Sequence, residues 1–235
     1  MTRISLFALL VAFAALPACS YDGHNRVNGS VSVRSGETAD KVSTVNGAID
    51  IADHATAREA ETVNGSIQLG AGAAADSLQT VNGGITLAEG AKVAHDVDTV
   101  NGAVTLARTA TVAGSVDTVN GAITLRENAE VSGRLKNVNG RIQLTDAHVG
   151  GGLETVAGDL FVGTNSRVEG GILVKKPHGR SLKNKVPRVV IGPGAVVRGT
   201  LRFEREVKLY VSETATIGPV EGAEAERFSG SEPAG

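Results

Sequence analysis

The residues best placed to do chemistry are two aspartates that precede successive copies of one tetrapeptide. Asp98 and Asp117 are 19 residues apart, and each is followed by Thr-Val-Asn-Gly. If these copies stack as layers, the two carboxylates lie one layer apart and could act as acid and base or bind a cation. The same position in neighbouring copies holds residues of mixed sign, which is equally typical of ordinary surface charge: Glu61, Gln79, Lys136 and Glu154.

The histidines do not form a metal-binding pattern. His54, His95 and His148 fall at three different positions of the repeat. Layers two apart are separated by about 9.6 Å, whereas zinc ligands lie about 2 Å from one ion. We therefore predict no metal and no cofactor. His178 stays open as a base for acyl transfer, although the location outside the cytoplasm that residues 1–19 predict, as described below, would leave little access to acyl-CoA.

The element that must position these residues is the tetrapeptide repeat itself. Its asparagines recur every 18 or 19 residues, at Asn28, Asn46, Asn64, Asn82, Asn101, Asn120 and Asn139. A period of this length is the mark of a repeat architecture in which each unit packs on its neighbours.

Each repeat reads as three short strands. Ile85-Thr86-Leu87 shows the apolar–polar–apolar alternation of a half-buried strand, and Ala91 with Val93 and then Val97 supply further inward positions. A single coil cannot bury its own apolar face, so the coils must stack. We predict an all-β fold, a single-stranded parallel β-helix (β-solenoid) of about ten coils, roughly triangular in section. Each coil is expected to take roughly 18–19 residues, the period of the repeat.

The Asn-Gly pair is expected to be a corner. Asn tolerates left-handed backbone geometry and Gly adopts it freely. We expect the preceding Val inside, the seven asparagines stacked as a ladder, and the threonines forming a parallel hydroxyl ladder. This assigns the motif to structure rather than to ligand binding. The period lengthens from 18 to 19 residues between Leu87 and Thr99, which predicts a bulge or a looser corner there.

Residues 1–19 read as a lipoprotein signal. Arg3 precedes an apolar run that is too short to span a bilayer. The run ends in Leu-Pro-Ala-Cys, which resembles the lipobox, so Cys19 is the predicted lipidation site and 20–25 a tether. Ser20 then favours the outer membrane, on either side of it. The alternative is an ordinary secretory signal with an incidental Cys19.

The regular coils are predicted over 26–174, and a basic segment without acids follows at 175–188. Its prolines and glycine predict a loop. The loop is either a solvated excursion or a contact to anionic partners such as lipid phosphates or cell-wall polymers, through Lys175, Lys176, Arg180, Lys183, Lys185 and Arg188. A six-residue rhythm predicts further coils over 189–220, and 221–235 is predicted to be a disordered tail.

Composition favours thin, regularly stacked layers over a globular enzyme core. The chain has 235 residues, a net charge of −2, no Trp and 3% aromatics, whereas enzyme cores usually use more large aromatic anchors. The small net charge gives no reason to expect a nucleic-acid partner.

Two family resemblances follow from these motifs. The Val-Asn-Gly-x-Ile-x-Leu repeats over 26–162 resemble the adhesin-like family of β-strand repeats, and Val-Val-Ile-Gly-Pro-Gly-Ala-Val-Val-Arg-Gly-Thr-Leu at 189–201 resembles the polymer-forming bactofilins. The resemblance to bactofilins implies a right-handed β-helix and, as in some members of that family, association end to end.

The sequence therefore predicts a non-enzymatic, lipid-anchored envelope protein that serves as a scaffold or adhesin-like surface. Its predicted partners are the membrane, through Cys19, further copies of the chain, and a cell-wall or other anionic envelope polymer. The alternative is a carbohydrate-binding or carbohydrate-active β-helix that uses the outer face near Asp98 and Asp117.

Overall fold

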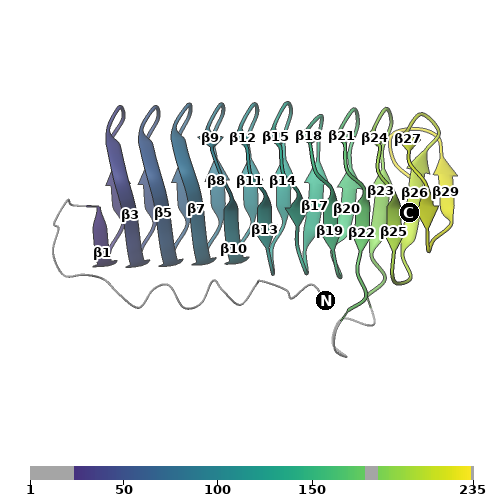
Figure 1. Cartoon of the computed structure of the whole chain (residues 1–235), viewed down its shortest axis with the longest axis horizontal. Coiled ribbons are helices and arrows are strands. Elements are labelled where there is room, and N and C mark those ends of the chain that lie inside the picture. The colour runs from purple at the N-terminus through teal and green to yellow at the C-terminus, as the bar shows by residue number, and fades with distance from the viewer. Residues whose placement is uncertain (1–23, 178–184, 234–235) are drawn as a thin grey trace.

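The computed structural model describes residues 24–177 and 185–233. Within these residues there is no helix, and the strands wind into a parallel β-solenoid of about ten turns, as the repeat predicted. Figure 1 shows the coils side by side in one rod, with the first and last coils at opposite ends. The right-handed sense stays a prediction.

One side of the rod is an eleven-stranded sheet. Its strands, one per coil, are β2 (Val31–Val33), β4 (Ile49–Ile51), β6 (Ile67–Leu69), β8 (Ile85–Leu87), β11 (Val104–Leu106), β14 (Ile123–Leu125), β17 (Arg141–Leu144), β20 (Asp159–Val162), β23 (Arg188–Ile191), β26 (Lys208–Ser212) and β29 (Ala225–Phe228). Ile85 and Leu87 are fully buried and Thr86 between them is exposed, so the predicted alternation is confirmed. Burying such an aliphatic side chain stabilises the fold by about 1.5–3 kcal/mol.

An eighteen-stranded sheet forms the rest of the wall. It begins with β1 (Asn25–Asn28) and three long strands, β3 (Thr38–Asn46), β5 (Thr56–Asn64) and β7 (Ala74–Asn82). Later coils carry two short strands in place of each long one: β9 (Lys92–Val93) and β10 (Val97–Asn101), β12 (Thr111–Val112) and β13 (Val116–Thr118), β15 (Glu130–Val131) and β16 (Leu135–Lys136), β18 (His148–Val149) and β19 (Leu153–Thr155), β21 (Arg167–Val168) and β22 (Ile172–Val174), β24 (Val196–Val197) and β25 (Leu201–Phe203), β27 (Thr216–Ile217) and β28 (Val220–Glu221).

The long strand splits where the period lengthens. Val93 pairs with Ala75 and so keeps the shorter period of the first coils. Val97 pairs with Leu78, one position further back than that period would place its partner. The extra residue therefore lies between β9 and β10, where a bend replaces continuous strand. This is the looser corner that the change of period predicted.

The Val of each tetrapeptide was expected to point inward, but it does not. Thr80 is buried and Val81 only half-buried, because inward side chains alternate from Leu78. Thr80 donates its hydroxyl hydrogen bond to the Gly65 carbonyl of the preceding coil at 2.9 Å. The same bond recurs at Thr44, Thr62, Thr99 and Thr118. The threonines thus satisfy backbone carbonyls instead of forming a hydroxyl ladder.

The glycine of the tetrapeptide is needed for a reason other than the expected left-handed geometry. Gly29 and Gly140 do adopt a positive φ, but neither Asn64 nor Gly65 does. A Cβ at Gly65 would instead lie 1.8 Å from the carbonyl oxygen of Gly47, one layer below. Left-handed residues stack at a different corner, after each of the first nine strands of the eleven-stranded sheet: Gly36, His54, Gly72, Gly90, Thr109, Asn128, Asp146, Asn165 and Gly194.

The asparagines form a ladder on the exposed surface. Each side-chain amide donates to the Oδ1 of the layer before, at 2.9–3.0 Å, over the run Asn28, Asn46, Asn64, Asn82, Asn101 and Asn120. Asn139, the seventh predicted member, meets Asn120 through a backbone bridge. The ladder is therefore a structural feature of the first six layers.

The repeat is interrupted once and then resumes. Leu160 pairs with Ile142, one ordinary repeat before it, but its partner in the following coil is Val189, well beyond one repeat. The segment after β22 is therefore an insertion into one coil. The coils then continue in register, with Val189, Ile191, Val197 and Leu201 buried.

The prediction of a disordered tail at 221–235 is wrong for the residues described up to 233. β29 pairs with β26, and Phe228 is only 8% exposed. Polar composition suggested disorder, but an edge strand keeps charged side chains because nothing packs beyond it. Arg227 is the register partner of the buried Val211 but is itself exposed in this last described layer, where its guanidinium donates to the Ser212 carbonyl at 3.2 Å.

Gly65→Ala should destabilise the protein by about 3 kcal/mol, because its methyl group has to displace backbone rather than a side chain. Gly84→Ala is the matched control. A Cβ there meets only the Ala103 carbonyl, at 3.1 Å, and the equivalent residue in neighbouring coils is Ala48, Ser66 or Ala103. The control should change stability by less than about 0.5 kcal/mol. Urea unfolding of both variants measures the difference; equal destabilisation would rule out this steric explanation.

Candidate functional site

Asp98 and Asp117 lie side by side on the outer face of the eighteen-stranded sheet. They are register partners on β10 and β13, so one layer separates them, as predicted. Both side chains are partly buried, and Oδ1 of Asp117 is buried without a hydrogen-bond partner. The pair is thus poorly solvated for surface carboxylates.

This environment favours the protonated forms. Burial, followed by repulsion from Asp117 and Asp96, raises the pKa of Asp98 from 3.8 to about 6. Burial likewise raises the pKa of Asp117, although Lys136 and Arg134 oppose the shift. In mildly acidic solution the pair therefore holds a proton that an ordinary surface aspartate would have lost.

The column of outward side chains continues from this pair toward the C-terminus. Register partners run Asp98, Asp117, Lys136, Glu154, Leu173, Arg202 and Glu221. The charges alternate in sign over much of this column, and Arg202 contacts Glu221 at 4.0 Å. Leu173 is the one apolar member of this run.

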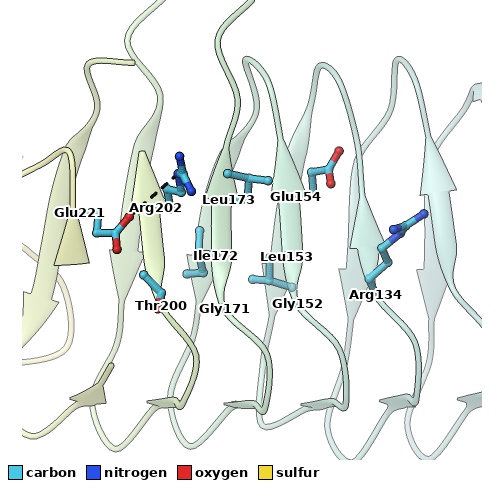
Figure 2. A pocket seen from close by; sticks show the side chains of 10 residues that line it. All are labelled: Arg134, Gly152, Leu153, Glu154, Gly171, Ile172, Leu173, Thr200, Arg202 and Glu221. Carbon is cyan, nitrogen blue, oxygen red and sulfur yellow. Dashed lines mark ion pairs between the residues drawn. The ribbon is translucent and has the colours of Figure 1, made fainter. Parts of the chain in front are cut away.

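A shallow groove of about 470 Å³ lies along the later part of this column. Figure 2 shows side chains of Arg134, Glu154, Arg202 and Glu221 along it, with Gly152 and Gly171 between them. A Cβ at Gly171 would lie 2.1 Å from the Thr200 carbonyl oxygen, so tight stacking forces glycine here and hollows the surface.

Together the pair and the groove offer two functions. A carboxylic acid held protonated beside a second carboxyl group is the arrangement that acid–base catalysis uses. A groove that follows the rod axis suits an extended chain better than a compact ligand.

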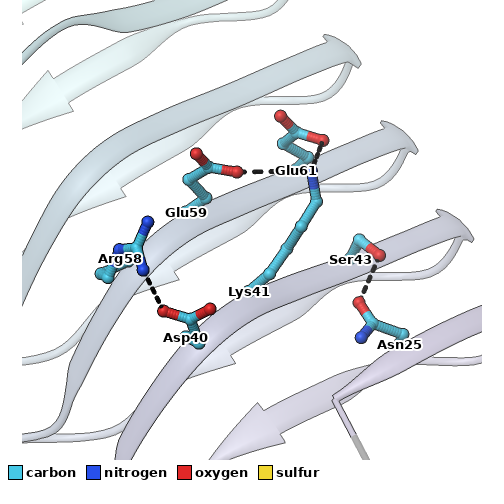
Figure 3. Close-up of polar contacts among 7 residues, drawn as sticks. All are labelled: Asn25, Asp40, Lys41, Ser43, Arg58, Glu59 and Glu61. Atoms are coloured by element: carbon cyan, nitrogen blue, oxygen red, sulfur yellow. Dashed lines mark hydrogen bonds and ion pairs between the residues drawn. The ribbon is translucent and has the colours of Figure 1, made fainter. Parts of the chain in front are cut away.

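Charges on the first coils are paired with each other. Figure 3 shows Arg58 against Asp40 and Lys41 between Glu59 and Glu61. Arg58 lies 2.5 Å from Asp40, and both side chains are more than half exposed. Such surface pairs contribute at most about 1 kcal/mol each, and here they neutralise one another.

Two of the described histidines, His24 and His148, lie beside carboxylates. His24 contacts Glu37 at 3.5 Å, and His148 lies between Glu130 and Glu169. Within residues 24–177 and 185–233, no group of three or more His, Cys, Asp and Glu side chains could hold a metal ion. His178 lies outside the described residues.

The basic segment is drawn back onto the solenoid where it is described. Lys175 binds Glu154 at 2.5 Å, and Lys185 binds Asp159 at 3.3 Å. Arg188 stacks over the ring of Tyr210. Lys176 is held through its backbone, which donates to Glu204. The remaining predicted contacts, Arg180 and Lys183, lie outside the described residues.

Cys19 and the signal at 1–19 also lie outside the described residues. Across the part of the chain that is described, no helix is long and apolar enough to cross a membrane.

No family model, curated protein or solved structure matches this chain. The resemblances to adhesin-like repeats and to bactofilins therefore stay predictions.

Sequence reasoning located the aspartates but not the groove or its arginines. The signal was present in the glycine pairs that recur at the bend between the short strands, Gly151-Gly152 and Gly170-Gly171. An outward-facing cluster around Phe161 and Tyr210 was missed as well. The clue in the sequence was Phe161, an aromatic residue in an outward column whose earlier members are polar.

The raised pKa of Asp98 makes stability depend on pH. Because the folded-state pKa lies above the unfolded one, protonation favours the fold, and this contribution is lost as pH rises from about 4 to about 6. Asp98→Asn cannot ionise, so the unfolding free energy of this variant should increase relative to that of the wild type as pH rises from about 4 to about 6. Urea midpoints at about pH 4, 5, 6 and 7 measure the gain; a difference that does not change with pH would contradict the assignment.

Proposed function

We propose that this protein is a non-enzymatic, lipid-anchored component of the cell envelope that presents its outer faces as a scaffold or adhesin-like surface. The observation that carries the proposal is the rod itself, about ten turns with long outward columns of side chains. Its interior is filled by aliphatic side chains, which leaves the outer faces as the surface for partners. Such a shape serves contacts along its length.

The proposed anchor is at the N-terminal end of the rod. Cys19 precedes β1 by six residues, so a lipid on it would hold the first coil near a membrane surface. The last coil would then extend away from the membrane by about ten layers, or roughly 48 Å. As part of the same proposal, we infer outer-membrane location from Ser20, the residue that follows Cys19.

Cys19→Ala should abolish incorporation of labelled palmitate and move the protein from the membrane fraction to the soluble envelope fraction. The matched control is Ser20→Ala, which leaves the thiol in place and should retain the label. Envelope fractionation with palmitate labelling measures both. If Cys19→Ala remains labelled and membrane-bound, the anchor is elsewhere and this part of the proposal fails.

A second candidate is carbohydrate binding or hydrolysis at the groove. It is favoured by one observation, the poorly solvated pair Asp98 and Asp117 in the same column as the groove. In this function the protonated aspartate acts as acid, and its neighbour one layer away acts as the nucleophile that so short a separation allows, forming a glycosyl-enzyme that water then hydrolyses. Arg134 and Arg202 hold the glycan.

If the second candidate is right, the wild type cleaves one member of a polysaccharide panel with saturable kinetics. Asp98→Asn and Asp117→Asn should each lower kcat by about 100-fold or more while binding persists. Arg202→Gln should mainly raise KM. The reducing ends released report the rate. Absence of turnover by the wild type across the panel would reject hydrolysis and leave the scaffold as the proposed function.

A further inference from the structure

Two arginines on the eleven-stranded sheet are held by aromatic rings instead of by acids. The guanidinium of Arg141 lies 4.8 Å from the ring centre of Phe161, and that of Arg188 lies 5.0 Å from the ring centre of Tyr210. These distances are those of cation–π contacts. No ion pair of either guanidinium occurs among the described residues, and Nε of Arg188 is buried without a hydrogen-bond partner.

Three other described arginines are engaged in a different way. Arg58 and Arg198 bind carboxylates at 2.5 and 2.7 Å, and Arg205 donates to backbone carbonyls. Those contacts use the N–H groups that a ligand would need. A ring orients the planar guanidinium but leaves its N–H edge available for a carboxylate or phosphate.

The two arginines lie in one column along the rod. In register, Arg141 is followed by Asp159, then Arg188, then Lys208. Arg141 and Arg188 are therefore two layers, or about 10 Å, apart. The acid between them is already occupied, since Lys185 binds Oδ2 of Asp159 and the Arg188 backbone N–H binds Oδ1.

The adjacent outward column supplies apolar surface. Phe161, Val190 and Tyr210 are register partners, whereas Thr105, Thr124 and Gln143 occupy this column in earlier coils. Val190 is only 8% exposed between the two half-buried rings. The parts of the rings that remain exposed supply apolar contact area for a bound chain, and the arginines beside them bind acidic groups.

We propose that Arg141, Phe161, Arg188 and Tyr210 form a binding surface for an acidic glycan that runs along the rod. A linear polymer with repeated acidic groups matches cations spaced along one column. A membrane would need cations spread across the face, and the outward column next to the arginines carries Thr105 and Thr124 in earlier coils. Nucleic-acid bases would need ring faces, which the arginines cover. The inference deepens the envelope role proposed above and rests on it.

Binding to polygalacturonate tests the surface, with dextran as the neutral polymer. All proteins in this experiment, including the one called wild type, carry Cys19→Ala, so that the proposed lipid cannot insert into vesicles. Wild type should bind the acidic polymer saturably and dextran much more weakly. The double variant Arg141→Gln/Arg188→Gln should lose at least about tenfold in affinity. Arg141→Lys/Arg188→Lys should lose nearly as much, because Lys keeps the charge but not the planar fork. Arg58→Gln and Arg198→Gln, which remove charge elsewhere, should bind as the wild type does.

Three results would overturn the proposal: no saturable binding by the wild type, equal losses in the Arg58→Gln control, or binding to phosphatidylglycerol vesicles or single-stranded DNA in preference to polygalacturonate. A thermal unfolding midpoint equal to that of the wild type shows that each variant is folded. The anchor is tested separately through Cys19, so failure here is distinguishable from failure of the envelope role.

Discussion

The distance between successive backbones is the constraint on which the rest of this structure depends. Parallel strands fix each coil about one strand spacing above the last, and at the tetrapeptide corner that spacing leaves no room for a side chain. Gly65 lies against the Gly47 carbonyl, and Thr62 donates its hydroxyl hydrogen bond to that same carbonyl. One contact excludes a methyl group and the other satisfies the carbonyl that causes the exclusion. Thr and Gly recur at a fixed separation in the sequence because each layer needs both contacts.

Because the interior is occupied by uniform aliphatic layers, variation between coils is confined to the outer columns. There, neighbouring side chains one layer apart determine one another's ionisation and orientation. Asp117 helps to keep Asp98 protonated, and Phe161 holds Arg141 flat. Each effect needs two coils, so single repeats carry no site of their own.

Most of the fold was predictable from the sequence, since the short, nearly constant period of the asparagines and the alternation at Ile85-Thr86-Leu87 leave few alternatives to a solenoid. The facing of Thr80 and Val81 was predicted wrongly because both residues are β-branched and both recur; counting by twos from Leu78 gives the right answer. For the site, the register of Asp98 and Asp117 follows from the repeat alone. The contacts of Lys185 and Arg188 do not, because their partners are reached across an insertion whose length hides the register. The last strand escaped detection because it is an edge, where apolar alternation is weakest.

The charged side chain of Arg227 in that last strand has a consequence for the length of the stack. Solenoid layers are nearly interchangeable, and a stack of interchangeable layers has no intrinsic length. Arg227 occupies a register position that holds an aliphatic residue in earlier coils. A following layer would therefore have to bury a guanidinium in an apolar interior. Stacking a further layer on this end would therefore require removing a charge from water, which makes the last described strand a poor template for added strands.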